Sequence, residues 1–192
     1  KDRNWKKLSL KSKTLLIRMQ KIYSKISKKK SEKLYKILSK FNLKINKHKE
    51  WKNLKAEPDS EDRFFAEVRN NDLEWVMKLM IGDNEQCCYA TGIYTVVLTF
   101  PSEYPFKPPV VKFTPAIYHP GINQETGEIC ADVLREEWGP TRNVRWIMSV
   151  LYTMFLDEGA NHAVEQEIMK QKEENYDAFK AKVAAQIAEL ME

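Results

Sequence analysis

A proline-rich connector constrains the fold of this chain more than any other stretch. The sequence FPSEYPFKPPVVKF, from Phe100 to Phe113, holds four prolines within nine residues. Each proline fixes its backbone φ and lacks an amide donor, so residues 101–109 must form a rigid loop outside any sheet. The flanking segments, Gly92 to Phe100 and Val110 to Phe113, are rich in β-branched and aromatic residues. They are predicted to be strands that this proline connector (residues 101–109) separates.

An earlier segment is predicted to be a strand of the same sheet. From residue 73 to residue 80 apolar and polar residues alternate, which places four side chains on one face: Leu73, Trp75, Met77 and Leu79. A turn is predicted at residues 82–84, which are Gly, Asp and Asn. Short strands joined by short turns predict an antiparallel meander.

The hydrophobic period changes after Cys130, from that of strands to that of helices. A single apolar stripe predicts a buried helix that Asn143 or Thr141 caps. The stripe consists of Val144, Ile147, Met148, Leu151, Tyr152 and Phe155. Further helices are predicted at 163–172 and 176–190, and the end of another at 51–57, before Pro58. Strands followed by helices indicate the α+β class.

Charge divides the chain into two parts. Residues 1–49 contain 18 basic and two acidic residues, a balance of +16, whereas the remainder has 14 basic and 25 acidic residues, a balance of −11. We therefore predict a basic Lys-rich extension at 1–49 and a folded domain at 50–192. The extension has three open interpretations: a solvated arm, the remnant of an organelle transit peptide, or a contact for nucleic acid or an anionic membrane. It lacks the pattern of a stacking platform, so no specific nucleic acid is expected.

The three cysteines do not predict a disulfide framework. Cys87 and Cys88 are adjacent and are interpreted as structural residues, and no Cys-x-x-Cys pattern with a histidine partner indicates zinc. The longest apolar runs span only a few residues, far below the ~20 that cross a bilayer, so no transmembrane segment is predicted. These features favour a reducing compartment, the cytoplasm or the nucleus. The Lys-rich extension leaves an organelle of the plastid type as the alternative.

Four motifs occur in a characteristic order: the proline connector, YHPGIN from Tyr118 to Asn123, GEIC ending at Cys130, and LREEWGPT ending at Thr141. In this combination, residues 51–192 resemble the ubiquitin-conjugating enzymes. The resemblance implies a UBC-like α+β fold. In that fold an antiparallel β-meander of about four strands packs with an N-terminal helix, a buried central helix and two C-terminal helices.

The resemblance also implies an activity. In this family an activating enzyme, which consumes ATP, passes ubiquitin or a ubiquitin-like modifier to a cysteine as a thioester. A ligase then guides the transfer of the modifier to a substrate lysine. The resemblance implies no metal and no other cofactor for the conjugating enzyme itself.

The family's site residues map onto the YHPGIN and GEIC motifs. Cys130 matches the cysteine that carries the thioester, and His119 is expected to brace the active-site loop rather than to act as a base. Typical members have an asparagine after the His-Pro pair, thought to stabilise the oxyanion of the transfer step or to brace the active-site loop, but here the residue is Gly121. Asn123 is the nearest candidate donor. Restoring the lost side chain with Gly121→Asn is therefore expected to accelerate transfer to lysine.

A second departure lies at residues 157–164, DEGANHAV, where typical members have a proline-rich acidic segment. The family carboxylate that positions the incoming lysine falls on His162. This histidine could accept a proton from the amine, or it could simply follow a helix cap at Asn161. Asp157 and His162 are therefore predicted as supporting residues of the site.

The expected partner surface lies on two loops. Phe106, Pro140 and Thr141 match positions at which relatives contact their ligases. Trp138 and Pro140 are expected to form a rigid flap after the cysteine. Exposed apolar residues at such positions are typical of a protein contact.

Two alternatives from other classes stay open. The loss of the family asparagine at Gly121 would suit a noncatalytic scaffold with the same fold, although known inactive members lack the cysteine that this chain has at 130. Alternatively, the basic extension at 1–49 is the functional part and binds nucleic acid, with an affinity that falls steeply as salt rises.

Overall fold

The computed structural model describes residues 47–57, 59, 61, 63–69, 73–158 and 162–191. The basic extension before residue 47, Pro58 and the cap proposed at Asn161 lie outside these residues. The division of the chain at residue 49 stays a prediction.

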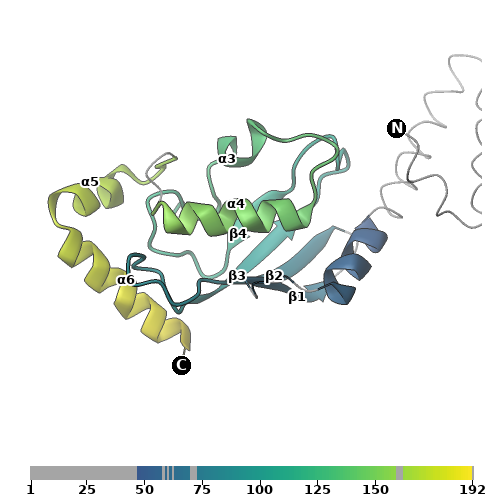
Figure 1. Cartoon of the computed structure of the whole chain (residues 1–192). Helices are drawn as coiled ribbons and strands as arrows, with labels where there is room; N and C mark the ends of the chain where they lie inside the picture. Colours follow the sequence, from purple (N-terminus) through teal and green to yellow (C-terminus); the bar gives the residue numbers. More distant parts are fainter. Residues whose placement is uncertain are drawn as a thin grey trace, which may run out of the picture. The chain divides into compact units, whose positions relative to one another are not determined.

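One antiparallel sheet forms the centre of the described domain (Figure 1). Its strands follow one another in the order β1-β2-β3-β4, as expected for a meander. They span Phe64–Arg69, Glu74–Met80, Ile93–Thr99 and Val110–Phe113. The predicted α+β class and four-stranded meander are confirmed.

Strand β1 has no counterpart among the segments that the sequence marks as strands. Its central inward residue is the small Ala66, and its register with β2 shifts between Ala66 and Val68. The alternation of large apolar residues that marks β2 is therefore missing.

The predicted inward face of β2 needs one correction. Leu73 precedes the strand, and 55% of its surface is exposed. The prediction is right for Trp75, Met77 and Leu79, which are fully buried. The alternation of side chains between the two faces thus begins at Glu74, the first residue of β2 and the partner of Thr99 in β3, and not at Leu73.

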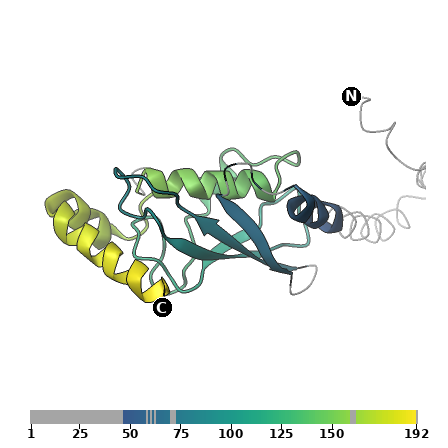
Figure 2. The ribbon, with the colours of Figure 1, turned by 60° about the horizontal axis from the view of Figure 1, so that its bottom comes forward.

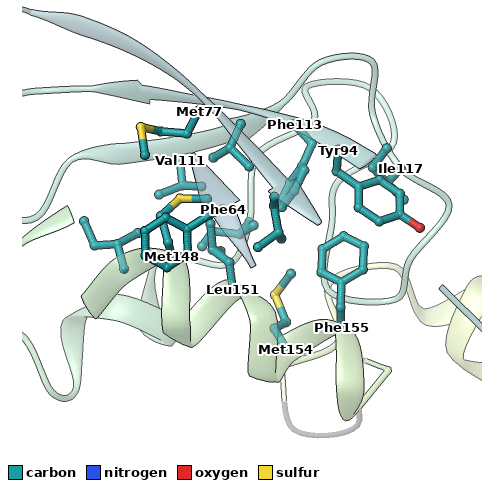
Figure 3. Packing of buried hydrophobic residues seen from close by; sticks show 14 of the residues in the cluster. Phe64, Met77, Tyr94, Val111, Phe113, Ile117, Met148, Leu151, Met154 and Phe155 are labelled. Atoms are coloured by element: carbon teal, nitrogen blue, oxygen red, sulfur yellow. The ribbon is translucent and has the colours of Figure 1, made fainter. Parts of the chain in front are cut away.

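A long central helix covers one face of the sheet (Figure 2). This helix, α4, spans Val144–Leu156, and the side chain of Asn143 caps it by accepting a hydrogen bond from the Trp146 amide at 3.0 Å. All residues of the predicted apolar stripe are buried except Tyr152, which is half-buried. Near its end Phe155 packs against Tyr94 and Phe113, with ring centroids 4.7 and 5.4 Å apart (Figure 3).

The other helices lie at the two ends of the sheet (Figures 1 and 2). Residues 47–56 form a helix at one end, where Trp51 contacts Trp75 edge to face at 5.1 Å. At the other end lie α5, Gln166–Glu174, and α6, Tyr176–Met191. Helix α5 begins three residues later than predicted, because Glu165 has an extended backbone, with φ −104° and ψ 90°, and the amides of Val164 and Glu165 donate to the carbonyl of Pro120. A short helix that was not predicted, α3, spans Asp132–Arg135.

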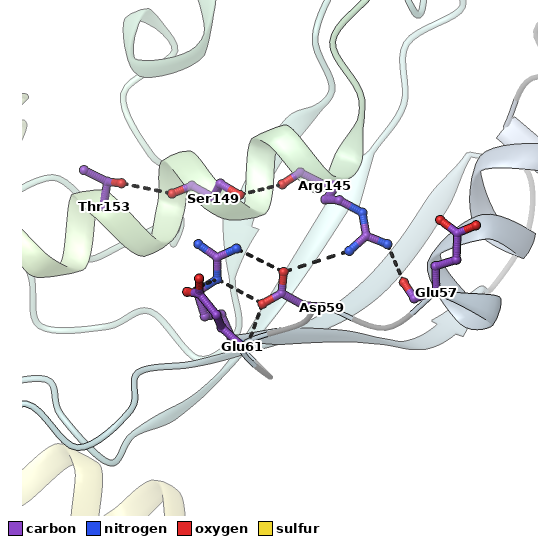
Figure 4. A network of polar contacts seen from close by, with 7 residues as sticks. Glu57, Asp59, Glu61, Arg145, Ser149 and Thr153 are labelled. Carbon is purple, nitrogen blue, oxygen red and sulfur yellow. Dashed lines mark hydrogen bonds and ion pairs between the residues drawn. The ribbon is translucent and has the colours of Figure 1, made fainter.

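A buried carboxylate connects β1 to α4 (Figure 4). Asp59 is 6% exposed and accepts two hydrogen bonds from the Arg63 guanidinium, at 2.9 and 3.0 Å. Arg145 of α4 lies 3.9 Å from the same carboxylate and also donates to the carbonyl of Glu57. The hydrogen bonds from Arg63 hold the pKa of Asp59 below its usual range.

Replacing Asp59 by asparagine is expected to lower the free energy of unfolding by about 2 kcal/mol at pH 7, since a buried guanidinium contact loses its charged acceptor. The lowered pKa means that this stabilisation is present above the ordinary carboxyl pKa and is lost as pH falls through the folded-state value. Urea unfolding of both proteins at pH 7 and pH 3 checks this. Equal stability of the two proteins at pH 7 would contradict it.

Candidate active site

Cys130 lies at the end of a hairpin that packs beside β4. Ile122 and Ile129 form an antiparallel bridge, and the carbonyl of Gly127 accepts a hydrogen bond from the Phe113 amide at 2.8 Å. Gly127 has a φ of +75°, and a Cβ there would lie 2.3 Å from the Phe113 carbonyl oxygen, so only glycine fits this turn. Cys130 itself is half-buried.

The chain after Cys130 turns at once into α3. The amide of Val133 donates to the carbonyl of Cys130 at 3.2 Å, and Leu134 anchors the short helix in the core. The cysteine therefore stands between two fixed elements, the hairpin and α3. Cys87, by contrast, is buried, and its Sγ donates to the carbonyl of Phe155 at 3.5 Å.

Gly121 and Cys130 each adjoin one residue of the same antiparallel bridge. Ile122, which follows Gly121, pairs with Ile129, which precedes Cys130. The main chain of His162 packs on the same glycine, because a Cβ at 121 would lie 3.3 Å from the His162 carbonyl oxygen. The fold thus brings together the cysteine, the substituted family position and the rebuilt segment around His162.

His119 is fully buried behind this hairpin. Its Nδ1 accepts the amide hydrogen of Gly121 at 2.9 Å, so Nε2 carries the proton and faces the Met154 carbonyl at 3.3 Å. Burial lowers the pKa of His119 to about 4, so the ring is neutral at pH 7. The imidazole joins the YHPGIN turn to α4, a geometry that favours the bracing role over that of a base.

Asn123 builds the turn of the hairpin. Its Oδ1 accepts hydrogen bonds from the Thr126 amide at 2.8 Å, the Thr126 hydroxyl at 3.0 Å and the Glu125 amide at 3.2 Å. Its side-chain oxygen is thus committed to residues that lie before the cysteine. The role of Asn123 as a substitute donor stays a prediction.

Asp157 and His162 both lie in residues 157–164, the segment that departs from the family pattern. Asp157 is the exposed C-cap residue of α4, and His162 is half-buried. Beyond His162 the amides of Val164 and Glu165 both donate to the Pro120 carbonyl, at 2.8 and 2.9 Å. These bonds hold the segment against the YHPGIN turn.

Glu158 is a residue of this region that the sequence interpretation missed. It is 7% exposed, has a φ of +51°, and its carboxylate forms an ion pair with Lys172 at 3.3 Å. No local sequence signal marks it, since an acid beside a helix end is usually solvated. Its partners come from segments 14 to 70 residues away.

The predicted ligase-facing residues lie on two loops that one hydrogen bond joins. Phe106 is 67% exposed, and Pro140 and Thr141 are exposed as well. The indole N–H of Trp138 donates to the Pro105 carbonyl at 2.8 Å, which fixes the loop of Pro140 to the proline connector.

A half-buried carboxylate connects this surface to the rest of the domain. Glu50 accepts hydrogen bonds from the Tyr104 hydroxyl, at 2.8 Å, and from the Val144 amide at the start of α4. Burial raises the pKa of Glu50, and these two hydrogen bonds oppose that rise. The helix at 47–56, the proline connector and α4 are therefore held together at one residue.

A groove of about 710 Å³ adjoins the cysteine. It lies between the proline connector, β4 and α3, and its wall includes Ile129 and Ala131, the two neighbours of Cys130. Across the described ranges no group of histidine, cysteine, aspartate and glutamate side chains could hold a metal ion. Nor does any helix in those ranges have the length and apolar character needed to cross a membrane.

Comparison with known proteins assigns the family. Residues 45–187 match the family model described as ubiquitin-conjugating enzyme. The chain belongs to the ubiquitin-conjugating enzyme family. The expected UBC-like fold is confirmed by solved structures of this family that superimpose on the chain.

Two such structures come from parasites. A candidate ubiquitin conjugating enzyme from Plasmodium yoelii is 28% identical, with a TM-score of 0.66, over 75% of this chain and 92% of that one. The E2 domain of a Toxoplasma gondii ubiquitin conjugating enzyme is 25% identical, with a TM-score of 0.65, over 75% of this chain and 95% of that one.

Proposed function

We propose that this chain carries ubiquitin or a ubiquitin-like modifier as a thioester on Cys130 and transfers it to a substrate lysine. The observation that best supports the proposal is the position of Cys130, half-buried at the hairpin end and flanked by residues that line an open groove. Cys87 is buried in the core and has no such surroundings.

Charging is an exchange between two thioesters. The Cys130 sulfur attacks the carbonyl carbon of the modifier's C-terminal glycine, a carbon–sulfur bond forms, and the bond to the activating enzyme's cysteine breaks. That cysteine leaves as a thiolate, which takes up the proton lost from Cys130. Such an exchange needs an accessible sulfur but no dedicated base.

Transfer to lysine makes greater demands on the site. The uncharged amine forms a bond to the carbonyl carbon, the carbon–sulfur bond breaks, and the amine releases a proton to a base or to water. The developing oxyanion has no side-chain donor at Gly121, whose amide donates to His119. We propose His162 as the group that receives the amine proton. We propose Asp157 as an acidic residue on the side of the site that the substrate lysine approaches.

The proposed partners follow from the family. An activating enzyme supplies the modifier, and a ligase contacts Phe106, Pro140 and Thr141 on the loops that Trp138 joins. The chain itself is proposed to need no cofactor, since ATP is used by the activating enzyme.

Incubation with purified activating enzyme, ATP and ubiquitin tests the proposal, with other modifier and activating-enzyme pairs supplied one at a time. The expected result is one adduct, larger by the mass of the modifier, that a thiol reductant cleaves. An absence of adduct with every pair would favour the second candidate, a noncatalytic scaffold, which the missing donor at Gly121 supports.

The packing around Gly121 argues against the acceleration expected for Gly121→Asn. Sequence alone predicts faster transfer to lysine, but the His162 main chain and the His119 ring both lie 3.3 Å from where a Cβ would stand. An asparagine therefore requires the His162 carbonyl and the His119 ring to shift by a few tenths of an ångström. We expect the variant to discharge to lysine about tenfold more slowly than the wild type, because displaced acceptor groups lose alignment.

Single-turnover discharge of the charged protein to free lysine measures this effect. Gly121→Ala adds the Cβ alone, so it measures the part of the slowing that comes from the 3.3 Å contacts, and the larger asparagine is expected to slow discharge further. Faster discharge of Gly121→Asn would contradict the steric argument and favour the lost-donor interpretation.

We propose the cytoplasm or the nucleus as the location, with an organelle of the plastid type as the alternative through residues 1–49. A fluorescent reporter fused to these residues tests the alternative. Import of the fusion into an organelle supports it, and a diffuse signal argues against it.

A further inference from the structure

The buried acid Glu158 occupies a position that is unfavourable on two counts. Its φ of +51° lies in the left-handed region, which glycine adopts more easily than any residue with a Cβ. The residue is also only 7% exposed, and a buried carboxylate is tolerated only with partners. Both features indicate that the surrounding contacts hold this residue in place.

Those contacts come from three separate parts of the fold. One carboxylate oxygen accepts hydrogen bonds from the Cys88 amide at 3.2 Å and from the Tyr176 hydroxyl at 3.0 Å. The other pairs with the Lys172 ammonium at 3.3 Å, and the same ammonium donates to the Glu158 carbonyl at 3.2 Å. The loop after β2, helix α5 and helix α6 are thus joined to the end of α4.

The electrostatics agree with this geometry. Burial alone would raise the pKa of Glu158, but the hydrogen bonds from Cys88 and Tyr176 and the charge of Lys172 outweigh burial and hold its pKa below the ordinary value. The carboxylate is therefore charged at neutral pH and the ion pair with Lys172 is intact.

The chain four residues later is fixed against the active-site turn. The Val164 and Glu165 amides donate to Pro120, and the Glu165 carboxylate accepts the Gln124 amide hydrogen at 2.8 Å. His162 lies between these bonds and Glu158 in the chain, and its carbonyl packs on Gly121, whose neighbour Ile122 pairs with the residue before Cys130. Glu158 therefore anchors the α4 end of the segment from His162 to Glu165. This segment covers Gly121.

We propose that Glu158 is a positioning residue for transfer to lysine. Its ion pair with Lys172 and its hydrogen bonds from Tyr176 and Cys88 set where the segment from His162 to Glu165 lies beside Cys130. The segment then forms the wall against which an acceptor lysine aligns. Charging of Cys130, which needs only an accessible sulfur, does not depend on this wall. The inference rests on the proposed function for its kinetic part.

Discharge to two nucleophiles separates positioning from general stability. Hydroxylamine is small and uncharged at neutral pH, so it needs no wall, whereas lysine must lose a proton and be aligned. For the ubiquitin-charged protein we expect Glu158→Gln and Lys172→Met to discharge to free lysine at least about tenfold more slowly than the wild type. Charging and discharge to hydroxylamine are expected to stay within about twofold of the wild type.

Two further variants complete the set. Lys172→Arg keeps the charge and is expected to restore most of the lysine rate, while Glu173→Gln changes an exposed neighbour on α5 and is expected to behave as the wild type. Equal slowing toward lysine and hydroxylamine, or an unchanged lysine rate in Glu158→Gln, would overturn the proposal.

Amide hydrogen exchange tests the same positioning without any modifier. In Glu158→Gln the amides of Val164 and Glu165 are expected to exchange at least about tenfold faster, with β3 and α4 unchanged. If the wild-type protein accepts no modifier, the proposed function fails and this measurement decides the inference. Unchanged exchange at both amides would overturn it.

Discussion

Alanine at position 130 is expected to abolish every adduct with a modifier that a thiol reductant can cleave. The thiol of Cys130 is the only sulfur in the described part of the chain that stands at the hairpin end beside the groove. A side chain without a nucleophile cannot form the carbon–sulfur bond, so the expected loss is complete. Gel analysis with and without reductant measures it.

Serine at the same position distinguishes chemistry from packing. Any adduct that the serine hydroxyl forms is an oxygen ester, which survives the thiol treatment that cleaves a thioester. Cys88→Ala is the control, because Cys88 is half-buried in the loop after β2 and its thiol is not assigned a role in the transfer. An adduct cleaved by reductant in Cys130→Ala would refute the assignment of the carrier residue.

Acid is expected to destabilise the protein through His119. Burial holds its folded-state pKa at about 4, below the ordinary value of ~6.5, so the unfolded chain binds a proton that the folded protein excludes. The stabilisation is complete above pH 6.5 and is lost as pH falls from there toward 4. Between pH 7.5 and pH 5 this amounts to a loss of about 2 kcal/mol in the free energy of unfolding.

Urea unfolding across this range in the wild type and in His119→Gln isolates the contribution. The variant is expected to be less stable at pH 7.5 and to lose about 2 kcal/mol less than the wild type on going to pH 5. His162→Gln is the control and should keep the wild-type slope. Should His119→Gln not fold, an NMR titration of the His119 ring replaces it. A ring that titrates near pH 6.5 would contradict the burial argument.

Local hydrophobic patterns correctly predicted the helices and strands in which the repeat of apolar residues is uninterrupted. The apolar stripe of α4 and the β-branched run of β3 each repeat over several residues, so their position and inward face follow from sequence. Strand β1 fails this test because Ala66 interrupts its large inward residues. The first turn of α5 was wrong because two amides bond to Pro120, a contact 44 and 45 residues away that no local pattern records.

The candidate site was only partly predictable for the same reason. Cys130 lies in a motif, and the resemblance of that motif to the family alone predicts it as the carrier residue. Gly121 and His162 could be recognised as departures, but sequence gives no sign that they touch. In the structure the His162 main chain fills the space that a side chain at 121 would need, so the two departures form one arrangement. Glu158 escaped notice because its ion pair and hydrogen bonds are all long-range.

Mass spectrometric peptide mapping of the adduct tests the carrier assignment most directly. The adduct is isolated without reductant at acidic pH, which preserves a thioester, and digested before fragmentation. The account predicts the modifier's C-terminal glycine on the sulfur of Cys130. A remnant on Cys87, on Cys88 or on a lysine side chain, with Cys130 unmodified, would contradict it.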